Sequence, residues 1–208
     1  MNTALLVAAT GLATTLGLIA AIGPQNLFVL RQGLTATHVL PVIALCTVSD
    51  AILILAGTAG LGAVVTSHPG VVDGLRYLGG AYLLVLGALA ARRCVRPVAA
   101  AAAPDLGAAT SAGLWAVLGT AAAMTWLNPH TYLDTVVLIG SLANSHGSTL
   151  RWVFALGACA GSVLWFVALG KGASRMSPLF RSPRAWRVLD AVVAVVMGGM
   201  GIALIAAS

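Results

Sequence analysis

The sequence predicts an all-α integral membrane protein of six transmembrane helices, arranged as two inverted three-helix repeats in which helices one and four are broken. The first observation is composition: 60% of the 208 residues are hydrophobic and only 8% are charged, whereas a soluble domain carries about 25% charged residues. The second is a series of continuous apolar runs of about 20 residues, the length that a helix needs to cross a bilayer. The third is a proline-containing interruption in the opening run of each half.

Six apolar runs are expected to span the membrane. They cover residues 4–30, 39–66, 72–91, 112–141, 150–170 and 186–206. The first and fourth runs are longer than a span requires, so we expect each to be tilted or broken. The first run has no basic start and is too long for the apolar part of a cleaved signal peptide, so we expect it to be a transmembrane helix.

The net charge of +6 is distributed unevenly over the loops. Basic residues follow the first, third and fifth runs: Arg31, Arg92, Arg93, Arg96, Lys171, Arg175, Arg181, Arg184 and Arg187. On the other side lie only Arg76 and Arg151, both near helix ends. The positive-inside rule therefore predicts that these three loops are cytoplasmic and that both termini are outside. The basic residues are concentrated in alternate loops of a membrane protein. We therefore expect the protein to have the lipid bilayer, and no nucleic acid, as its partner.

A linker divides the chain into its two repeats. Residues 92–112 combine an Arg cluster, two prolines and Ala-rich filler, which is typical of a flexible cytoplasmic linker. Within a single transmembrane domain, residues 1–208, it separates repeat one (1–91) from repeat two (113–208). Because three spans is an odd number, the second repeat must cross the membrane in the opposite direction to the first. This is the inverted-repeat plan of many secondary transporters.

The opening helix of each repeat contains a proline beside polar residues. These are Gly23, Pro24, Gln25 and Asn26 in repeat one, and Asn128 and Pro129 in repeat two. Proline removes a helical hydrogen bond, and in lipid the freed backbone groups must face protein or a watery cavity. A helix that restarts in mid-membrane, with Asn128 as N-cap and Pro129 next, points its positive end at an anion such as an amino-acid carboxylate. One such proline is more simply a kink, but two in mirrored positions indicate a binding site.

Two aspartates lie within apolar runs and away from the ends of those runs, Asp50 in the second and Asp134 in the fourth. An ionised carboxylate at the bilayer centre costs at least about 2.5–3.5 kcal/mol, so such residues face the bundle interior and either pair with a cation or hold a proton. Few basic residues lie deep enough to pair with them, which suggests that a ligand supplies the positive charge. The alternative is a structural salt bridge or hydrogen bond. His130, one turn before Asp134, either relays protons or, as is more common beside a helix break, is structural.

The remaining polar residues and the cysteines give weaker evidence about function. Arg76 either pairs with Asp73 along the helix surface or reaches into the bundle, and Asp190 is expected to pair locally with Arg187, three residues before it. The cysteines form no CxxC pair and are interpreted as packing residues: Cys46, Cys94 and Cys159. No cluster has metal-ligand spacing and no nucleophile lies beside a base, so we expect no metal, no cofactor and no enzyme activity.

Five segments together resemble the LysE family of amino-acid exporters: "IGPQNLFVLRQGL", "CTVSDAILILAGTAGLG", "LRYLGGAYLLVLG", "TWLNPHTYLDTVVLIG" and "RAWRVLDAVVAVVM". The resemblance covers nearly the whole chain in order. By position, its motifs imply these substrate-site residues: Gly23, Pro24, Gln25, Asn26, Asp50, Asn128, Pro129, Tyr132 and Asp134. Arg76 matches an accessory position, and Asp190 departs from the neutral or amide residue expected there. Gln25 favours the branch that exports basic amino acids over the branch for neutral ones.

The resemblance implies a transporter of the bacterial inner membrane that exports L-lysine or L-arginine, driven by the proton gradient or the membrane potential. Asp50, Asp134 and His130 are then the candidates for proton coupling, and a homodimer is compatible with the sequence. An exporter of neutral amino acids or of another small cation is an alternative. A further alternative is a membrane protein that does not transport, such as an assembly partner or an intramembrane enzyme, but the paired breaks and the absence of CxxC, HExxH and GxSxG argue against it.

Overall fold

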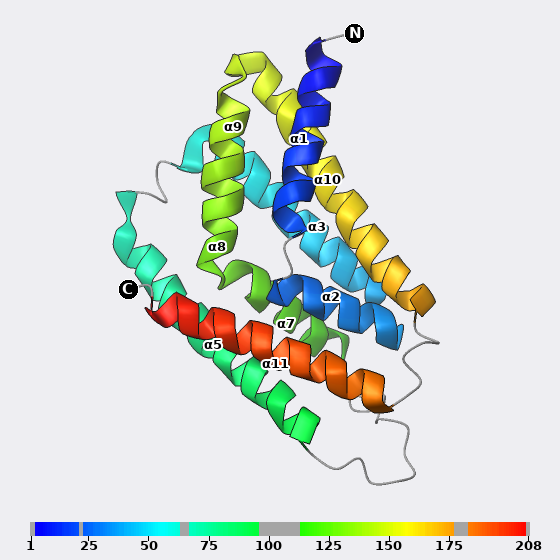
Figure 1. Ribbon diagram of the computed structural model, residues 1–208. Coiled ribbons are helices and arrows are strands. Elements are labelled where there is room, and N and C mark those ends of the chain that lie inside the picture. Colours follow the sequence, from blue (N-terminus) through cyan, green and yellow to red (C-terminus); the bar gives the residue numbers. More distant parts are fainter. Residues whose placement is uncertain (1–2, 21–22, 63–66, 96–112, 177–182, 207–208) are drawn as a thin grey trace.

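The structure, a computed structural model, describes residues 3–20, 23–62, 67–95, 113–176 and 183–206, which fold into helices (Figure 1). The elements are α1 (Thr3–Ile19), α2 (Pro24–Thr35), α3 (Val39–Ala56), the π-helix η1 (Gly57–Leu61), α5 (Pro69–Val95), α7 (Leu114–Trp126), α8 (Pro129–Thr131), the π-helix η2 (Tyr132–Ile139), α9 (Gly140–Asn144), α10 (Gly147–Met176) and α11 (Pro183–Ala206). Since no strand occurs in the described residues, the predicted all-α class is confirmed.

Several helices are long and apolar enough to cross a membrane. Among the described residues, three single helices meet this condition: Val39–Leu61, Gly147–Met176 and Arg184–Ala206. α1 and α2 together form a fourth candidate, bent by 85° between its two parts. These four correspond to the second, fifth, sixth and first predicted spans. The third predicted span falls on α5, and the fourth falls on α7 to α9, of which α7 is a shorter apolar helix.

Both opening helices are interrupted where the prolines predict it. α1 ends at Ile19 and α2 begins with Pro24, while α7 ends at Trp126 and α8 begins with Pro129. Each proline occupies the first position of the restarting helix. Its missing N–H has no partner to lose there, and its fixed φ suits the first turn of a helix.

Two features of the chain differ from the prediction. The predicted linker starts at residue 92, but α5 continues to Val95, with Arg92 and Arg93 in its last turn, where positive charge favours the helix dipole. The rest of that linker, residues 96–112, lies outside the described residues. The second predicted span is not one regular α-helix either, because it widens into η1 and contains Gly60 at φ 102°, a conformation that glycine adopts without strain.

The two π-helices lie against each other through small residues. Gly140 is the first residue of α9, which continues η2. A methyl group added at Gly140 would lie 2.6 Å from the carbonyl oxygen of Gly57 in η1. The backbones can therefore meet only because both positions lack a side chain. π-helical turns are often found at functional sites, and η2 carries Asp134.

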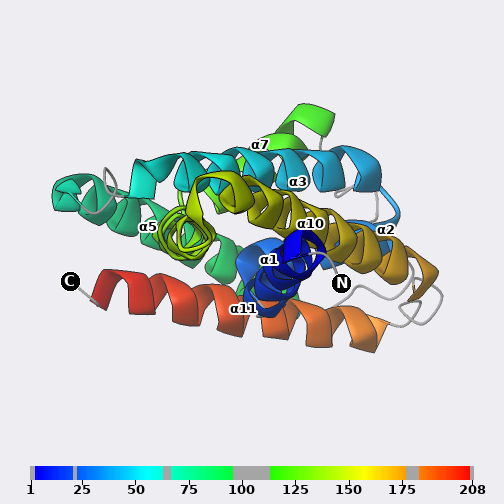
Figure 2. The same ribbon diagram turned by 90° about the horizontal axis from the view of Figure 1, so that it is seen from above.

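The most extensive helix contacts join helices of one predicted repeat to helices of the other. α1 packs along α10, α5 packs along α11, and α3 lies between α7 and α10 (Figure 2). Glycines allow the close approach: Gly157 of α10 contacts the backbone of Ala8 in α1, and a methyl at Gly201 of α11 would lie 2.9 Å from the Gly80 carbonyl oxygen of α5. The two predicted repeats therefore do not form separate packing units.

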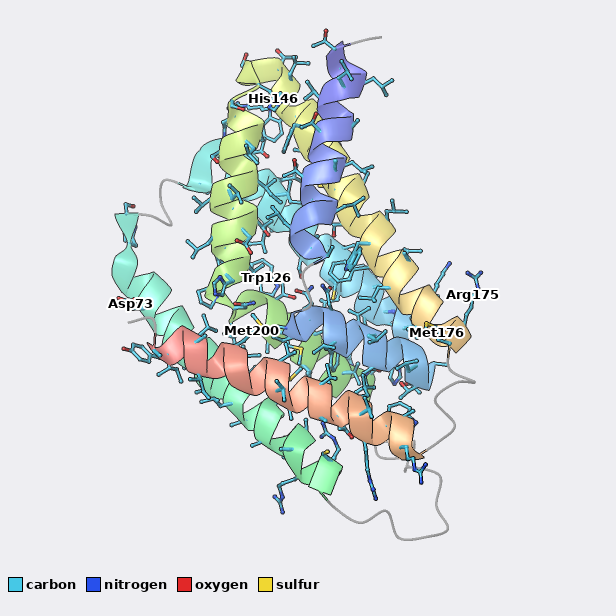
Figure 3. All side chains as sticks on the ribbon, viewed as in Figure 1. Asp73, Trp126, His146, Arg175, Met176 and Met200 are labelled. Atoms are coloured by element: carbon cyan, nitrogen blue, oxygen red, sulfur yellow. The ribbon has the colours of Figure 1, made fainter. Side chains whose placement is uncertain are left out.

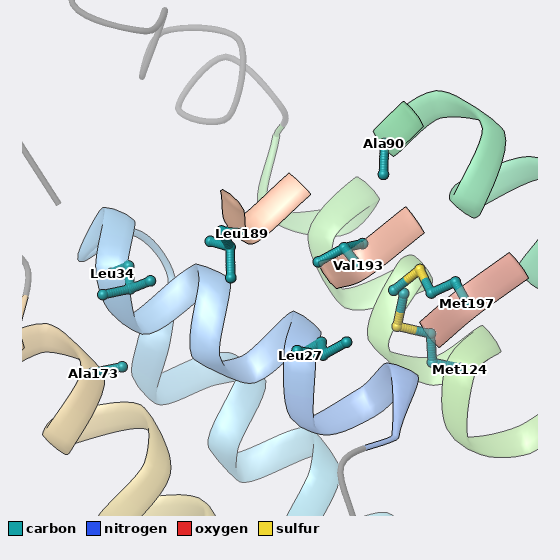
Figure 4. Packing of buried hydrophobic residues seen from close by; sticks show 8 residues of the cluster. All are labelled: Leu27, Leu34, Ala90, Met124, Ala173, Leu189, Val193 and Met197. Carbon is teal, nitrogen blue, oxygen red and sulfur yellow. The ribbon is translucent and has the colours of Figure 1, made fainter. Parts of the chain in front are cut away.

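A buried apolar cluster fills the space between α2, α5, α7, α10 and α11 (Figure 4). Its members are Leu27, Leu34, Ala90, Met124, Ala173, Leu189, Val193 and Met197. Leu27 and Leu34 of α2 belong to this cluster. Because Leu27 lies in the first turn of α2, the cluster packs the start of this helix against the rest of the bundle.

Candidate functional site

A cavity of about 270 Å³ lies where the two helix breaks meet, just below the usual size of small-molecule pockets, about 300–1,000 Å³. Its lining includes most of the predicted site residues: Gly23, Pro24, Gln25, Asn26, Asp50, Asn128, His130 and Asp134. Thr131 and Thr135 add hydroxyl groups, and Leu18, Phe166 and Met200 add apolar surface. The described residues that line it include two carboxylates but neither Lys nor Arg, so the cavity favours a cation.

Two predicted residues of the described part of the chain do not line this cavity. Pro129 is buried at the start of α8, and Tyr132 directs its hydroxyl to the Trp126 carbonyl oxygen, 2.8 Å away. Figure 3 shows Trp126 beside the break that precedes α8. Arg76 lies in α5, but its side chain is outside the described residues, as is its predicted pairing with Asp73.

Asp50 is the most buried acidic group of the cavity, with 5% of its surface exposed. Its Oδ2 accepts a hydrogen bond of 2.7 Å from Ser162 Oγ on α10. No basic side chain of the described residues forms an ion pair with it. Sequence reasoning missed Ser162, because a single serine in an apolar helix is too common to signal a contact with a helix more than 100 residues away.

Asp134 lines the same cavity from η2 and is exposed. Within the part of the chain that the structure describes, it makes no hydrogen bond or ion pair. His130 also lines the cavity, but no hydrogen bond between the His130 and Asp134 side chains occurs there. His130 and Asp134 therefore share the cavity, but the predicted proton relay between them has no direct hydrogen bond.

The two restarting helices differ in how their first turns are satisfied. Asn128 caps α8 as predicted: its Oδ1 accepts from the His130 N–H at 3.1 Å, and its carbonyl accepts from the Thr131 N–H at 3.1 Å. α2 instead begins after Gly23, which has no side chain to cap it. Because Asn128 already occupies the N–H groups of α8, the start of α2 is the better place for an anion.

The two amides beside Pro24 have different surroundings. Gln25 Nε2 is buried and has no hydrogen-bond partner among the described residues, although the Cys46 thiol lies next to it. Asn26 uses both ends of its amide: Nδ2 donates to the Ile19 carbonyl oxygen at 2.6 Å, and Oδ1 accepts from Trp165 Nε1 at 3.1 Å. Gln25 therefore offers a donor to a ligand, whereas Asn26 is held by the protein.

Asp190 lies outside the cavity and corrects a prediction. It pairs with Arg31 of α2 at 2.8 Å and with Arg93 of α5 at 3.2 Å, and not with Arg187, which is exposed. The predicted local pair is wrong because α11 turns Asp190 toward the neighbouring helices. No group of three His, Cys, Asp or Glu side chains that could hold a metal occurs among the described residues.

Comparisons with known proteins match this sequence to a transporter family. The family described as LysE type translocator matches residues 16–208. A Mycobacterium tuberculosis protein, provisionally named an amino-acid transporter, is 47% identical, over 90% of this chain and 91% of its own. The lysine exporter LysE of Corynebacterium efficiens is 40% identical, over 94% of this chain and 96% of its own. The arginine exporter protein ArgO of Serratia proteamaculans is 38% identical, over 93% of each.

No solved structure matches the chain. The family match and the relatives agree over nearly the full sequence, and several apolar helices of membrane-spanning length accompany them. The chain therefore is a multi-pass membrane protein and belongs to the LysE type translocator family.

Proposed function

We propose that the protein exports basic amino acids, L-lysine or L-arginine, from the cytoplasm. The observation that carries the proposal is the cavity at the two helix breaks, which has Asp50 and Asp134 in its lining and no basic residue among the described ones. Relatives named as a lysine exporter and an arginine exporter support the same substrate class.

A basic amino acid has one carboxylate and two cationic groups, and each can be matched in this cavity. The carboxylate binds at the uncapped start of α2, where Gln25 Nε2 adds a donor. Asp50 and Asp134 bind the α-ammonium and the distal cation. A neutral amino acid would leave one of the two carboxylates without a partner, which is unfavourable in a membrane.

Export is coupled to the proton gradient or the membrane potential in this proposal. Protonation of Asp50 or Asp134 from the outer side would weaken its attraction for the bound cation and promote release. His130 lies at the same cavity and is a further proton-binding group. The cycle would then move one cationic substrate outward as a proton moves inward.

We also propose that the chain crosses the bacterial inner membrane six times, as two inverted repeats with the linker at residues 92–112 in the cytoplasm and both termini outside. The basic residues of the loops support this orientation, and the paired breaks support the inverted repeat. Because the closest helix contacts run between the repeats, alternating access would involve helices from both repeats moving together, in a monomer or in a homodimer.

The test is a substrate panel with purified protein in proteoliposomes preloaded with lysine, arginine, leucine or a small organic cation. We expect efflux of lysine and arginine that requires an inward proton gradient or a membrane potential. Faster efflux of leucine would favour an exporter of neutral amino acids, faster efflux of the cation would favour the cation exporter, and no efflux of any compound would favour a protein that does not transport.

A further inference from the structure

Each helix break deprives several backbone carbonyls of their usual partners, among them those of Trp126 and Ile19. In a continuous α-helix the carbonyl oxygen of residue i accepts from the N–H of residue i+4. The Trp126 carbonyl would thus accept from His130, whose N–H donates to Asn128 Oδ1 instead. The Ile19 carbonyl would accept from Gly23, which is the extended N-cap of α2. In lipid such a carbonyl needs another donor.

In both repeats, the donor is a side chain from the restarting helix. Asn26, in the first turn of α2, donates from Nδ2 to the Ile19 carbonyl oxygen at 2.6 Å. Tyr132, one turn into the helix that starts at Pro129, donates from its hydroxyl to the Trp126 carbonyl oxygen at 2.8 Å. We call these two hydrogen bonds the carbonyl clasps.

An indole N–H ties each clasp to the middle helix of the opposite repeat. Trp165 of α10 donates to Asn26 Oδ1 at 3.1 Å, and Trp126 donates to Ser49 Oγ of α3 at 3.1 Å. Ser49 adjoins Asp50, and Trp165 lies one turn after Ser162, the hydrogen-bond partner of Asp50. Both clasps are thus anchored beside the hydrogen bond that joins α3 to α10.

We infer that Asn26 and Tyr132 are positioning residues, which hold the starts of the two restarting helices at the cavity and do not themselves bind the substrate. The Tyr132 side chain is not part of the cavity lining. Asn26 reaches the cavity, but both ends of its amide are engaged by protein. The expected effect of these residues on transport rests on the proposed function. Their expected effect on the structure of the two breaks rests on the hydrogen bonds alone.

The transport test uses Tyr132→Phe, which removes the O–H donor of one clasp, and Trp165→Phe, which removes the indole N–H that anchors Asn26 of the other. The matched controls are Tyr77→Phe and Trp115→Phe, since Tyr77 is 51% and Trp115 is 82% exposed. Loss of one hydrogen bond is expected to raise the KM of export about three- to tenfold. Because a positioning residue makes no contact with substrate, KM should rise by the same factor for lysine and arginine.

Two results would overturn the inference. A KM that rises for only one of the two amino acids would mean that the residue contacts the substrate. An unchanged KM, with only less folded protein in the membrane, would mean that the clasps are structural and do not organise the cavity.

Hydrogen–deuterium exchange of the purified protein tests the clasps without any assay of transport. Tyr132→Phe should speed exchange of the backbone amides of Leu127, Asn128, His130 and Thr131, and Trp165→Phe should speed it at residues 25–27, with no change in either control. Unchanged exchange at both breaks would contradict the inference even if export is normal. If the wild-type protein exports no amino acid, the proposed function fails, and the exchange result alone decides whether the clasps exist.

Discussion

Ser162 Oγ donates a hydrogen bond of 2.7 Å to Asp50 Oδ2, and this bond joins α10 to α3, the middle helices of the two proposed repeats. Ser162 is fully buried, so Asp50 has a fixed orientation toward the cavity. The bond couples the position of the buried Asp50 carboxylate to the packing of α3 against α10.

Ser162→Ala should lower lysine export about tenfold, because a hydrogen bond to a charged group contributes about 1.5–3 kcal/mol. Lysine efflux from preloaded proteoliposomes, normalised to folded protein, measures the effect. Ser174→Ala is the matched control, since Ser174 lies on the same helix and bonds only the Gly170 carbonyl oxygen among the described residues. Equal export by the two variants would mean that Asp50 does not depend on Ser162.

Asp134→Asn should raise the KM for lysine and arginine roughly fivefold, while any residual transport of a neutral amino acid should change less. The reason is that Asp134 lines the cavity without a partner among the described residues, so its charge is available to the substrate. Export kinetics measured for lysine and leucine check this, with Asp73→Asn, outside the cavity lining, as the control. An unchanged KM for lysine would remove Asp134 from the site.

Asp190→Asn should destabilise the protein by about 1–3 kcal/mol. Breaking a buried ion pair costs about 3–5 kcal/mol, and the value is smaller here because Arg31 is 22% exposed and Arg93 is 44% exposed. Thermal unfolding in detergent measures it. Arg187→Gln should have little effect, and the combined loss of Arg31 and Asp190 should be less than additive; additive losses would mean that the pair contributes nothing.

Gly157→Ala should destabilise the protein by about 1–3 kcal/mol through overpacking, because an added methyl group would overlap the Ala8 backbone of α1. Gly172→Ala on the same helix is the control, since no atom lies within 4 Å of a methyl group there. Unfolding temperatures of the two variants compare them directly. Similar temperatures would show that α1 and α10 are not packed as closely as described.

The sequence predicted the features that depend on local chemistry. Proline lacks an N–H wherever it occurs, so Pro24 and Pro129 identified both breaks, and Asn128 was correctly identified as an N-cap. Asp50 and Asp134 could be singled out because a carboxylate in an apolar run needs a special environment. Their presence at one cavity required the packing of α3 against η2, which no local pattern encodes.

Features that depend on which helices meet could not be predicted. Asp190 was assigned to Arg187, its nearest basic neighbour in sequence, whereas the packing of α11 against α2 and α5 brings Arg31 and Arg93 closer. Trp165 lies in an apolar run, where an indole N–H gives no signal until its acceptor, Asn26, is known. The π-helical turns were missed because their residues have ordinary helical patterns.

The most direct test of the proposed site is lysine efflux from proteoliposomes that contain either the wild-type protein or Asp50→Asn. The wild-type protein should release preloaded lysine when a proton gradient or a membrane potential is imposed. Asp50→Asn should be present in the membrane in equal amount and release none above the rate of empty vesicles. Full lysine efflux by Asp50→Asn would contradict the role of this cavity in export.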